Sequence, residues 1–514
     1  MNEYHMKIDQ RRWQKVEQKR REIMARYGSD NHAAAALTGI RALARQEPLL
    51  PTLQADLITL AIAMSEYDQA LLSANRLLKL LPGDFFAARA AAEAFSFCGK
   101  EEMALAAWQS VNGAEHRATA LAAMARMEAR AGHMEQAAVW IAEALARNPR
   151  DAMTVLTAGR IASKQGDTDR ATGILERCTH PAVPHALRAQ ALYELGEIQD
   201  RCGEPAKAVE FWRAAKRCLE EGFPNDVDLG RRIRHKTLER NRCLVEALNP
   251  ALVRRWRNQA PASKLPPVAV LAGHPRSGTT LLEQVLAAHP GVRDIDEQDA
   301  LACAVRETLF PGVPDGPDLT TLDALPADSF AATRRDYLRR VAMLREIGPD
   351  TGLLLDKNPN LTDFLPFLLG PLPELRILVA RRDPRDILLS CFRLAVLPQT
   401  GNIAWLREDH AAEEYRSIMA VWEKLRDCLG DDPGWLEVSY EALCADHEAE
   451  ARKVTAFLGL SWHPDQADYR TVRANARVAS PSYEAVRAPV HRSSIGRWQR
   501  YADLLPDMFE GFGK

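Results

Sequence analysis

The chain has 514 residues, of which 46% are hydrophobic and 26% charged, and its formal net charge is −2. This length exceeds one ordinary hydrophobic core, so we expect two or more domains. The balanced charge gives no general basis for nucleic-acid binding, and any anion site must therefore be local. No apolar stretch approaches the roughly 20 residues that cross a bilayer, and the charged start is unlike a signal peptide. We predict a cytoplasmic protein without a membrane span.

Residues 1–30 are predicted to form a charged helix. Acidic residues interrupt its basic run, which favours a solvated face over a membrane-surface helix. The nine cysteines are scattered, without the spacing of a zinc site. We expect them to be reduced, and we expect no bound metal.

Residues 31–245 are rich in alanine and leucine and repeat one helical pattern. Five alanines take the same place in successive copies, at intervals of 34, 33, 34 and 37 residues. Glycines stand just upstream of four of them, where a glycine permits a tight turn between two helices. The alanines are Ala70, Ala104, Ala137, Ala171 and Ala208, and the glycines are Gly99, Gly132, Gly166 and Gly203.

This pattern resembles tetratricopeptide repeats, whose period is about 34 residues. The resemblance implies stacked helix pairs that form a superhelix, with a concave face suited to a protein or peptide partner. An irregular helical bundle is the alternative.

The pattern changes in residues 246–266, where prolines gather and indicate a linker. Beyond it the short apolar runs VAVLAG, LRILVA and WLEVSY alternate with helical segments. This alternation predicts an α/β domain over residues 267–514, with a parallel sheet covered by helices on both faces. Functional residues of such sheets gather at the carboxyl ends of the strands.

The stretch GHPRSGTT, residues 273–280, directly follows the first of these strands. Its glycines are spaced as in a phosphate-binding P-loop, but Thr279 stands where that motif has lysine. The nearest cation is Arg276, which can hold a tetrahedral oxyanion. The loop therefore favours a phosphate with a less charged group beyond it, such as sulfuryl, handled without a metal. Alternatively, the glycines only relieve crowding at the turn.

A second basic cluster, RRDPRDILLSCFR, begins at the end of another predicted strand. Asp383 and Pro384 are ordinary signals for a helix start. Arg381 and Arg382 need an anionic partner if they are buried. They could hold a second phosphate of the same nucleotide.

At this point the sequence resembles the sulfotransferases that use 3′-phosphoadenosine 5′-phosphosulfate (PAPS), close to the tyrosylprotein sulfotransferases and to bacterial proteins that add tetratricopeptide repeats. The resemblance covers residues 266–505 and rests on the motifs PRSGTTLLEQVLAAHP, LLLDKNP, RRDPRDILLSCFR and SPSYEAVRAPVHRSSIGRWQRY. It implies in-line, metal-independent transfer of a sulfuryl group to an acceptor hydroxyl, with 3′-phosphoadenosine 5′-phosphate (PAP) as product. The fold expected is an all-α tetratricopeptide superhelix followed by an α/β, P-loop-like sulfotransferase domain.

The resemblance also implies a donor site. The loop would wrap the 5′-phosphosulfate, Arg382 and Ser390 would hold the 3′-phosphate, and Arg497 would add a charge there. Ser482 would contact the bridging region, and Tyr440 would either line the nucleotide site or pack as core. The full donor set is Arg276, Ser277, Gly278, Thr279, Thr280, Arg382, Ser390, Tyr440, Ser482 and Arg497.

Two further residues would act in catalysis together with Arg276 and Ser482. Glu297 follows Arg276 by 21 positions, where this branch places its general base, and a carboxylate there can take the acceptor's proton. Asp296 is the alternative base, and a solvated acidic turn is the alternative to both. Lys357 matches a lysine that neutralises charge on the reacting oxygens. It could instead form only a surface ion pair.

The acceptor is open. A polypeptide tyrosine, a carbohydrate, a lipid and a small phenol all offer the hydroxyl that the reaction needs. A different class of function is a repeat-based scaffold whose sulfotransferase-like domain binds nucleotide without turnover. Self-association as a homodimer is compatible with either.

Overall fold

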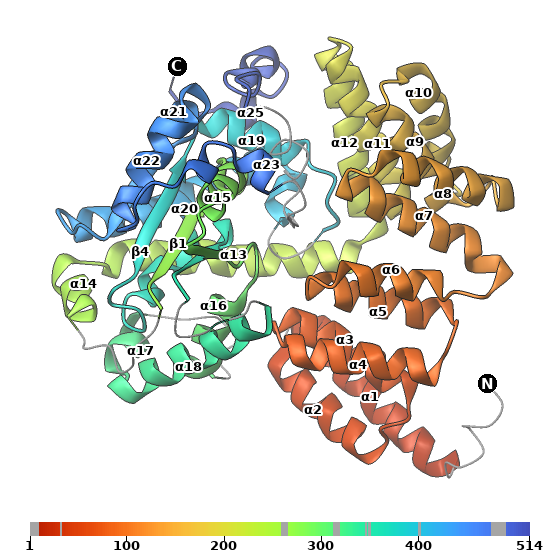
Figure 1. The fold of residues 1–514 in the computed structure, drawn as a ribbon, viewed down its shortest axis with the longest axis horizontal. Helices are drawn as coiled ribbons and strands as arrows, with labels where there is room; N and C mark the ends of the chain where they lie inside the picture. Colours follow the sequence, from red (N-terminus) through yellow and green to blue (C-terminus); the bar gives the residue numbers. More distant parts are fainter. Residues whose placement is uncertain are drawn as a thin grey trace. The chain divides into compact units, whose positions relative to one another are not determined.

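The computed structural model describes residues 10–30, 33–258, 266–311, 319–344, 347, 351–398, 402–473 and 490–513. These residues, drawn as a ribbon in Figure 1, divide into two compact units. The first runs to Thr157 and includes the end, from Arg339, of helix α18 (Ala327–Leu344). The second begins at Ala158 and contains the rest of the chain. Within the described residues, none of the helices has the length and apolar character needed to cross a bilayer.

The first unit consists of successive helices that pair with their neighbours, α3 with α4, α5 with α6, and α7 with α8. The helices are α1 (Gln10–Asp30), α2 (Ala33–Gln46), α3 (Pro51–Ala63), α4 (Tyr67–Leu80), α5 (Phe85–Phe97), α6 (Glu101–Gln109), α7 (Ala114–Ala131), α8 (Met134–Arg147) and the start of α9 (Ala152–Lys164).

The pairing follows from the small residues of the repeat. All five aligned alanines have 0% exposure, so a side chain of one carbon is what the packed helices accommodate there. The four turn glycines have φ between 71° and 95°, a left-handed conformation that costs glycine little. The helical region therefore resembles tetratricopeptide repeats, as the sequence predicts.

The second unit begins with the remaining helices of the repeat region and with α14, which lies inside the predicted linker. They are α10 (Thr168–Glu176), η2 (Arg177–Thr179), α11 (His185–Arg201), α12 (Pro205–Gly222), α13 (Pro224–Ala247) and α14 (Pro250–Arg257). Trp212 of α12 is fully buried, and its ring lies 5.7 Å from Tyr501 and 6.4 Å from Phe392. Lys216, one turn later, donates to the carbonyl of Trp405. The contacts thus divide the chain at residue 157, inside the repeats, whereas composition predicts a boundary at the proline-rich linker.

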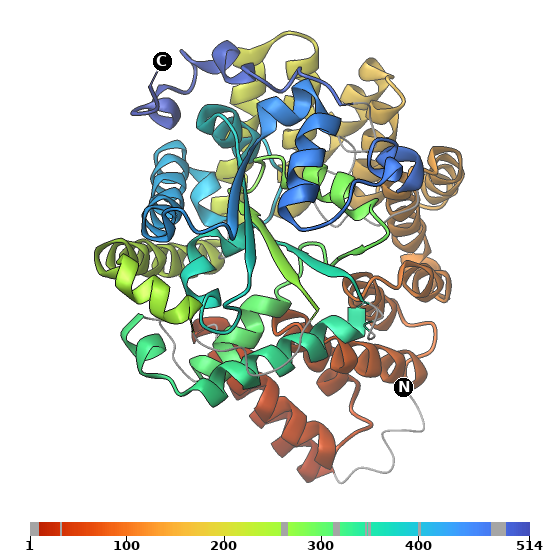
Figure 2. The same ribbon diagram turned by 60° about the vertical axis from the view of Figure 1, so that its left-hand side comes forward.

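A five-stranded parallel sheet forms the centre of this unit, in the order β2-β3-β1-β4-β5. Its strands are β1 (Val268–Gly273), β2 (Val292–Asp294), β3 (Leu353–Lys357), β4 (Arg376–Arg381) and β5 (Trp435–Ser439). Every residue of β1 and β3 is buried, as expected where helices cover both faces of a parallel sheet. Figure 2 shows these strands with helices on either side. The predicted fold class is confirmed.

The helices around the sheet complete the unit. Apolar residues of α15 and α22 pack on one face of the sheet, and η3 contacts both β1 and α20. These elements are α15 (Thr279–Ala287), α16 (Ala300–Leu309), α17 (Leu319–Ala324), α18 (Ala327–Leu344), η3 (Pro359–Leu368), α19 (Pro384–Phe392), η4 (Ile403–Leu406), α20 (Glu408–Leu429), α21 (Tyr440–Ala445), α22 (His447–Phe457), η5 (Pro464–Gln466), α23 (Tyr469–Val472), η6 (Arg497–Tyr501) and α25 (Pro506–Phe509).

Candidate active site

The loop between β1 and α15 has the backbone of an anion cradle. Arg276 and Gly278 have φ of 72° and 98°, which turns the chain sharply before α15 begins at Thr279. The left-handed conformation is costly for arginine and is typical of functional loops. Backbone N–H groups at a helix start favour an anion. The buried Oγ of Ser277 has no hydrogen-bond partner in the described part of the chain.

Gly278 is required by space as well as by conformation. A Cβ at this position would lie 2.4 Å from Cδ2 of Tyr440, which follows β5. Any larger residue would push the loop away from the tyrosine ring. Tyr440, predicted either to line the nucleotide site or to pack as core, is half-buried against the loop, and burial raises the pKa of its phenol to about 12.

Three of the predicted donor residues meet beside this loop. Nε of Arg276 donates to Oγ of Ser390, two residues before the end of α19 (Pro384–Phe392), over 2.9 Å. Nη1 of Arg382 donates to the carbonyl of Arg276 over 3.0 Å, and its guanidinium lies 4.4 Å from the centre of the Tyr440 ring. Its buried Nε has no hydrogen-bond partner among the described residues. Arg382, which directly follows β4, therefore places a positive charge next to the loop.

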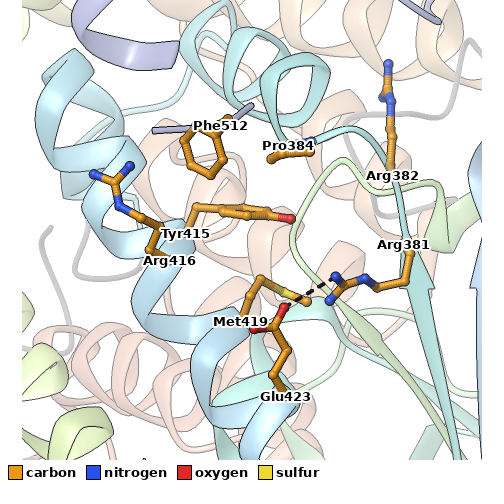
Figure 3. Close-up of a pocket in the computed structure, with 8 residues that line it drawn as sticks. All are labelled: Arg381, Arg382, Pro384, Tyr415, Arg416, Met419, Glu423 and Phe512. Atoms are coloured by element: carbon orange, nitrogen blue, oxygen red, sulfur yellow. Dashed lines mark hydrogen bonds and ion pairs between the residues drawn. The ribbon is translucent and has the colours of Figure 1, made fainter. Parts of the chain in front are cut away.

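The two neighbouring arginines at the end of β4 have different surroundings. Figure 3 shows Arg381 directed towards Glu423 of α20, with a bond of 3.4 Å, while the Arg382 side chain points away from Glu423. Successive side chains of a strand alternate between its two faces, which explains the split. Arg381 is thus held by acidic residues, and Arg382 is the one that contacts the loop. The pocket, of about 380 Å³, is lined by Arg381, Arg382, Pro384, Tyr415, Arg416, Met419, Glu423 and Phe512.

On the other side of β1, the end of β3 carries a buried lysine. Nζ of Lys357 lies 2.9 Å from Oε1 of Glu297, 3.0 Å from Oδ1 of Asp296 and 3.2 Å from Oε2 of Glu283. Burial by itself lowers the pKa of Lys357, but the three carboxylates outweigh it and raise that pKa above its ordinary value. The lysine therefore stays charged.

The candidate bases differ in access. The side chain of Glu297 is 28% exposed, whereas that of Asp296 is 8% exposed and has a backbone φ of 60°. Oδ1 of Asp296 accepts hydrogen bonds from the backbone N–H of Glu297 and from Lys357. Asp296 is thus occupied in holding the turn, and Glu297 presents more of its carboxylate to solvent.

Glu283 is a site residue that sequence reasoning did not identify. It lies in α15, directly beneath the loop, and is completely buried. Burial raises the pKa of Glu283 well above its ordinary value, although Lys357 opposes this. The signal in the sequence was a lone glutamate within the apolar segment LLEQVLA, a pattern that indicates a buried charge with a specific partner.

Sheet register connects these two groups. β1 pairs with β3 at Leu271 and Lys357 and with β4 at Gly273 and Ala380. The loop after β1 therefore lies between the strand ends that carry Lys357 and Arg382. An anion in the loop would have one cation on each side.

The C-terminal motif is described in part. Ser482 lies outside the described residues, so its predicted role has no geometry here. The carbonyl of Ser494 accepts a 2.6 Å bond from Nη2 of Arg382. Arg497 forms an ion pair with Asp200, a residue of repeat helix α11. This motif thus contacts both Arg382, a predicted donor residue, and the last repeat helices.

Fold and site together define an α/β domain with a sharply turned loop before α15 and an adjacent lysine–carboxylate cluster. Residues 267–464 match the model of the sulfotransferase family. Protein-tyrosine sulfotransferase 1 of Danio rerio is 22% identical over 278 residues, which are 51% of this chain and 75% of that protein. Residues 267–464 thus match the sulfotransferase family, and in this chain they follow a helical region that resembles tetratricopeptide repeats.

Two further comparisons extend this picture. An uncharacterized protein of Aquifex aeolicus (strain VF5) is 28% identical over 357 residues, 67% of this chain and 44% of that protein. The match thus spans less than half the length of that relative. The solved sulfotransferase domain of the Synechococcus PCC 7002 olefin synthase has 21% identity and a TM-score of 0.34, over 47% of this chain and 90% of that one.

Proposed function

We propose that this protein transfers a sulfuryl group from PAPS to an acceptor hydroxyl, with Glu297 as general base. The observation that carries the proposal is the lysine-free cradle, set between Arg382 and the Lys357–Glu297 pair, in a sulfotransferase-family domain. A cradle without the usual lysine suits a phosphate whose outer neighbour carries less charge than a terminal phosphate.

The residues around the loop fit such a donor. The buried Ser277 hydroxyl and Arg382 Nε have polar atoms without hydrogen-bond partners among the described residues, and such atoms are costly unless a ligand satisfies them. Residues 276–280 would hold the 5′ side, and Arg382, Ser390 and Arg497 the 3′-phosphate. When bound, the donor supplies a sulfuryl group that leaves its bridging oxygen with PAP.

Glu297 is proposed to take the proton that the acceptor hydroxyl loses. General-base catalysis needs an ionised, accessible carboxylate within hydrogen-bond reach. The Lys357 ammonium, 2.9 Å away, holds the carboxylate of Glu297 in place, and the 28% exposure of the Glu297 side chain gives an acceptor access. Asp296 lacks that access.

Lys357 is proposed to stabilise the negative charge that develops on the oxygens around the transferred group. Its position is fixed by β3 and by three carboxylates, so little reorganisation is needed when the charge appears. A preorganised cation of this kind typically contributes on the order of 100- to 1000-fold in rate.

A polypeptide tyrosine is the acceptor that we propose to test first, because two curated relatives are named protein-tyrosine sulfotransferases. The repeats would hold the polypeptide. We also propose that the protein acts in the cytoplasm. Its content of 46% hydrophobic and 26% charged residues is that of a globular protein, and none of the described helices could span a membrane.

The experiment is an incubation of the full chain with PAPS and a set of tyrosine-containing peptides, followed by mass spectrometry for a gained sulfonate. The Glu297→Gln variant is the control for background transfer. Sulfonate on tyrosine with the native protein alone supports the proposal. Release of PAP with sulfonate on another added hydroxyl compound would keep the reaction and change the acceptor. Absence of transfer to every hydroxyl compound, despite bound PAP, would favour a nucleotide-binding scaffold.

A further inference from the structure

Asp200 lies near the end of α11, and its side chain has no exposed surface. Its carboxylate is 3.1 Å from Nη2 of Arg393 and 3.2 Å from Nη1 of Arg500. It also accepts hydrogen bonds from the Arg497 guanidinium and the Tyr501 phenol. One buried acid of the repeat helices thus holds four side chains of the sulfotransferase region, and three of these are 297, 300 and 301 positions away.

The acid remains charged in this position. Burial alone would raise the pKa of Asp200, but Arg393, Tyr501 and Arg497 together lower it below its ordinary value. A buried carboxylate with several charge-assisted partners is hard to replace, because its loss leaves those cations without a counterion. The interaction therefore has a fixed geometry rather than the loose geometry of a surface pair.

The segment that Asp200 holds also reaches the donor site. The backbone N–H groups of Gly496 and Trp498 donate to Asp386 of α19 over 2.7 and 2.9 Å. Two residues earlier, the carbonyl of Ser494 binds Arg382, which in turn binds the carbonyl of Arg276. A continuous series of hydrogen bonds therefore runs from the repeat helix through this segment to the anion loop.

Arg497 can contact Asp200 and a bound ligand at the same time. Its bond to Asp200 uses Nη2, and a guanidinium has five N–H donors. Its side chain is 29% exposed, so part of the group remains open to a ligand. By holding Nη2, Asp200 fixes the orientation of the other N–H groups of the Arg497 guanidinium.

We propose that Asp200 is a positioning residue for donor binding. By holding Arg497 and Tyr501, it sets segment 490–501 against Arg382, so the last repeat pair completes the 3′-phosphate site. This inference rests on the proposed function, since only that function assigns Arg497 to a phosphate. It makes donor affinity depend on a residue of the repeats.

The test is calorimetric titration of the full chain with PAP. The variants are Asp200→Asn, Arg497→Gln, the double variant, and Glu197→Gln as the matched control. Glu197 is on the same helix and pairs with Arg393 over 2.9 Å, but it does not touch Arg497. Loss of one oriented charge-assisted contact should weaken PAP binding about 10- to 100-fold in Asp200→Asn. Glu197→Gln should stay within about 2-fold of native.

The double variant separates positioning from general stability. If Asp200 acts through Arg497, the double variant should bind PAP within about 3-fold of Arg497→Gln alone, because coupled residues are non-additive. Asp200→Glu should recover part of the affinity. Fully additive losses, or native affinity in Asp200→Asn, would overturn the inference.

Should Asp200→Asn fail to fold by circular dichroism, Tyr501→Phe removes one bond to Asp200 with little change in volume. It should weaken PAP binding about 3- to 10-fold, and unchanged affinity would overturn the inference. If the native chain itself does not bind PAP, the proposed function fails, and this inference fails with it.

Discussion

Lys357 donates a 2.9 Å hydrogen bond to Glu297, and the two side chains differ in burial, with the lysine 0% and the glutamate 28% exposed. The ammonium is therefore fixed inside the protein while the carboxylate reaches its surface. This relationship suits a base whose carboxylate is held in position and is accessible to an acceptor. It also distinguishes Glu297 from its buried neighbour Asp296.

Replacing Glu297 by glutamine should leave PAP binding within about 3-fold of native and lower turnover by about 100- to 10,000-fold, the usual contribution of a general base. Turnover is measured as sulfonate gained by the acceptor at saturating PAPS. Asp296→Asn is the matched control, since asparagine tolerates the positive φ of that position. A larger loss in Asp296→Asn than in Glu297→Gln would make Asp296 the base.

Replacing Gly278 by alanine should disrupt the loop. The new Cβ would lie 2.4 Å from the Tyr440 ring, at a φ of 98° that alanine rarely adopts. We expect a loss of PAP affinity of at least about 10-fold and a lower melting temperature, since such strain costs roughly 1–3 kcal/mol. Gly203→Ala is the control, because its Cβ would meet no atom within 4 Å at a similar φ of 83°. Equal PAP affinity in both variants would contradict the account of the loop.

Lys216 should make stability depend on pH. Burial lowers its pKa to about 7, against an ordinary value of 10.5 in the unfolded chain. Between these pH values the unfolded state binds a proton that the folded state does not. The free energy of unfolding therefore rises with pH across this range: it is highest above pH 10.5, and the gain is lost as the pH falls to about 7. The expected slope is about 1.4 kcal/mol per pH unit for one proton.

Lys216→Met should remove this part of the slope while filling a similar volume. The measurement is the free energy of unfolding by urea at several pH values from 7 to 10. Lys236→Met, a substitution on the neighbouring helix α13, serves as the control for a general loss of charge. If the native protein and Lys216→Met differ in free energy of unfolding by the same amount at every pH in this range, the lysine is charged in the folded state.

Truncation should distinguish the two parts of the repeat region. Deletion of residues 1–245 removes Asp200 and Trp212, exposing Phe392 and Tyr501, so we expect an aggregating protein that does not bind PAP. Deletion of residues 1–150 keeps both residues and should retain PAP affinity within about 3-fold. Size-exclusion chromatography and calorimetry test this. A well-folded, PAP-binding product of the longer deletion would contradict it.

Much of the fold follows from local patterns. Alanines repeated at intervals of 33 to 37 residues predict the helix pairs, because each must be small to be buried. Apolar runs predict the parallel strands, and a glycine-bracketed turn after the first of them predicts the anion loop. These signals are short-range, so one sequence is enough to reveal them.

Long-range partners were not predictable in the same way. Lys357 and Glu297 are 60 positions apart, and their contact arises from the ends of two adjacent elements. The Asp200–Arg497 contact spans 297 positions, and the sequence around either residue does not indicate which residue it will contact. Glu283 was missed because its role depends on burial beneath the loop.

The most direct test of the account is the equilibrium binding of PAP and of ATP to the full chain, each with magnesium and with a chelator. Arg276→Ala serves as the comparison variant. We expect micromolar or tighter binding of PAP in the chelator and weaker binding of ATP. In Arg276→Ala we expect PAP binding to weaken by about 100-fold or more, since that change removes the guanidinium of the loop and its charge-assisted hydrogen bonds to the donor. Preference for ATP with a requirement for magnesium, or native PAP affinity in Arg276→Ala, would contradict the account.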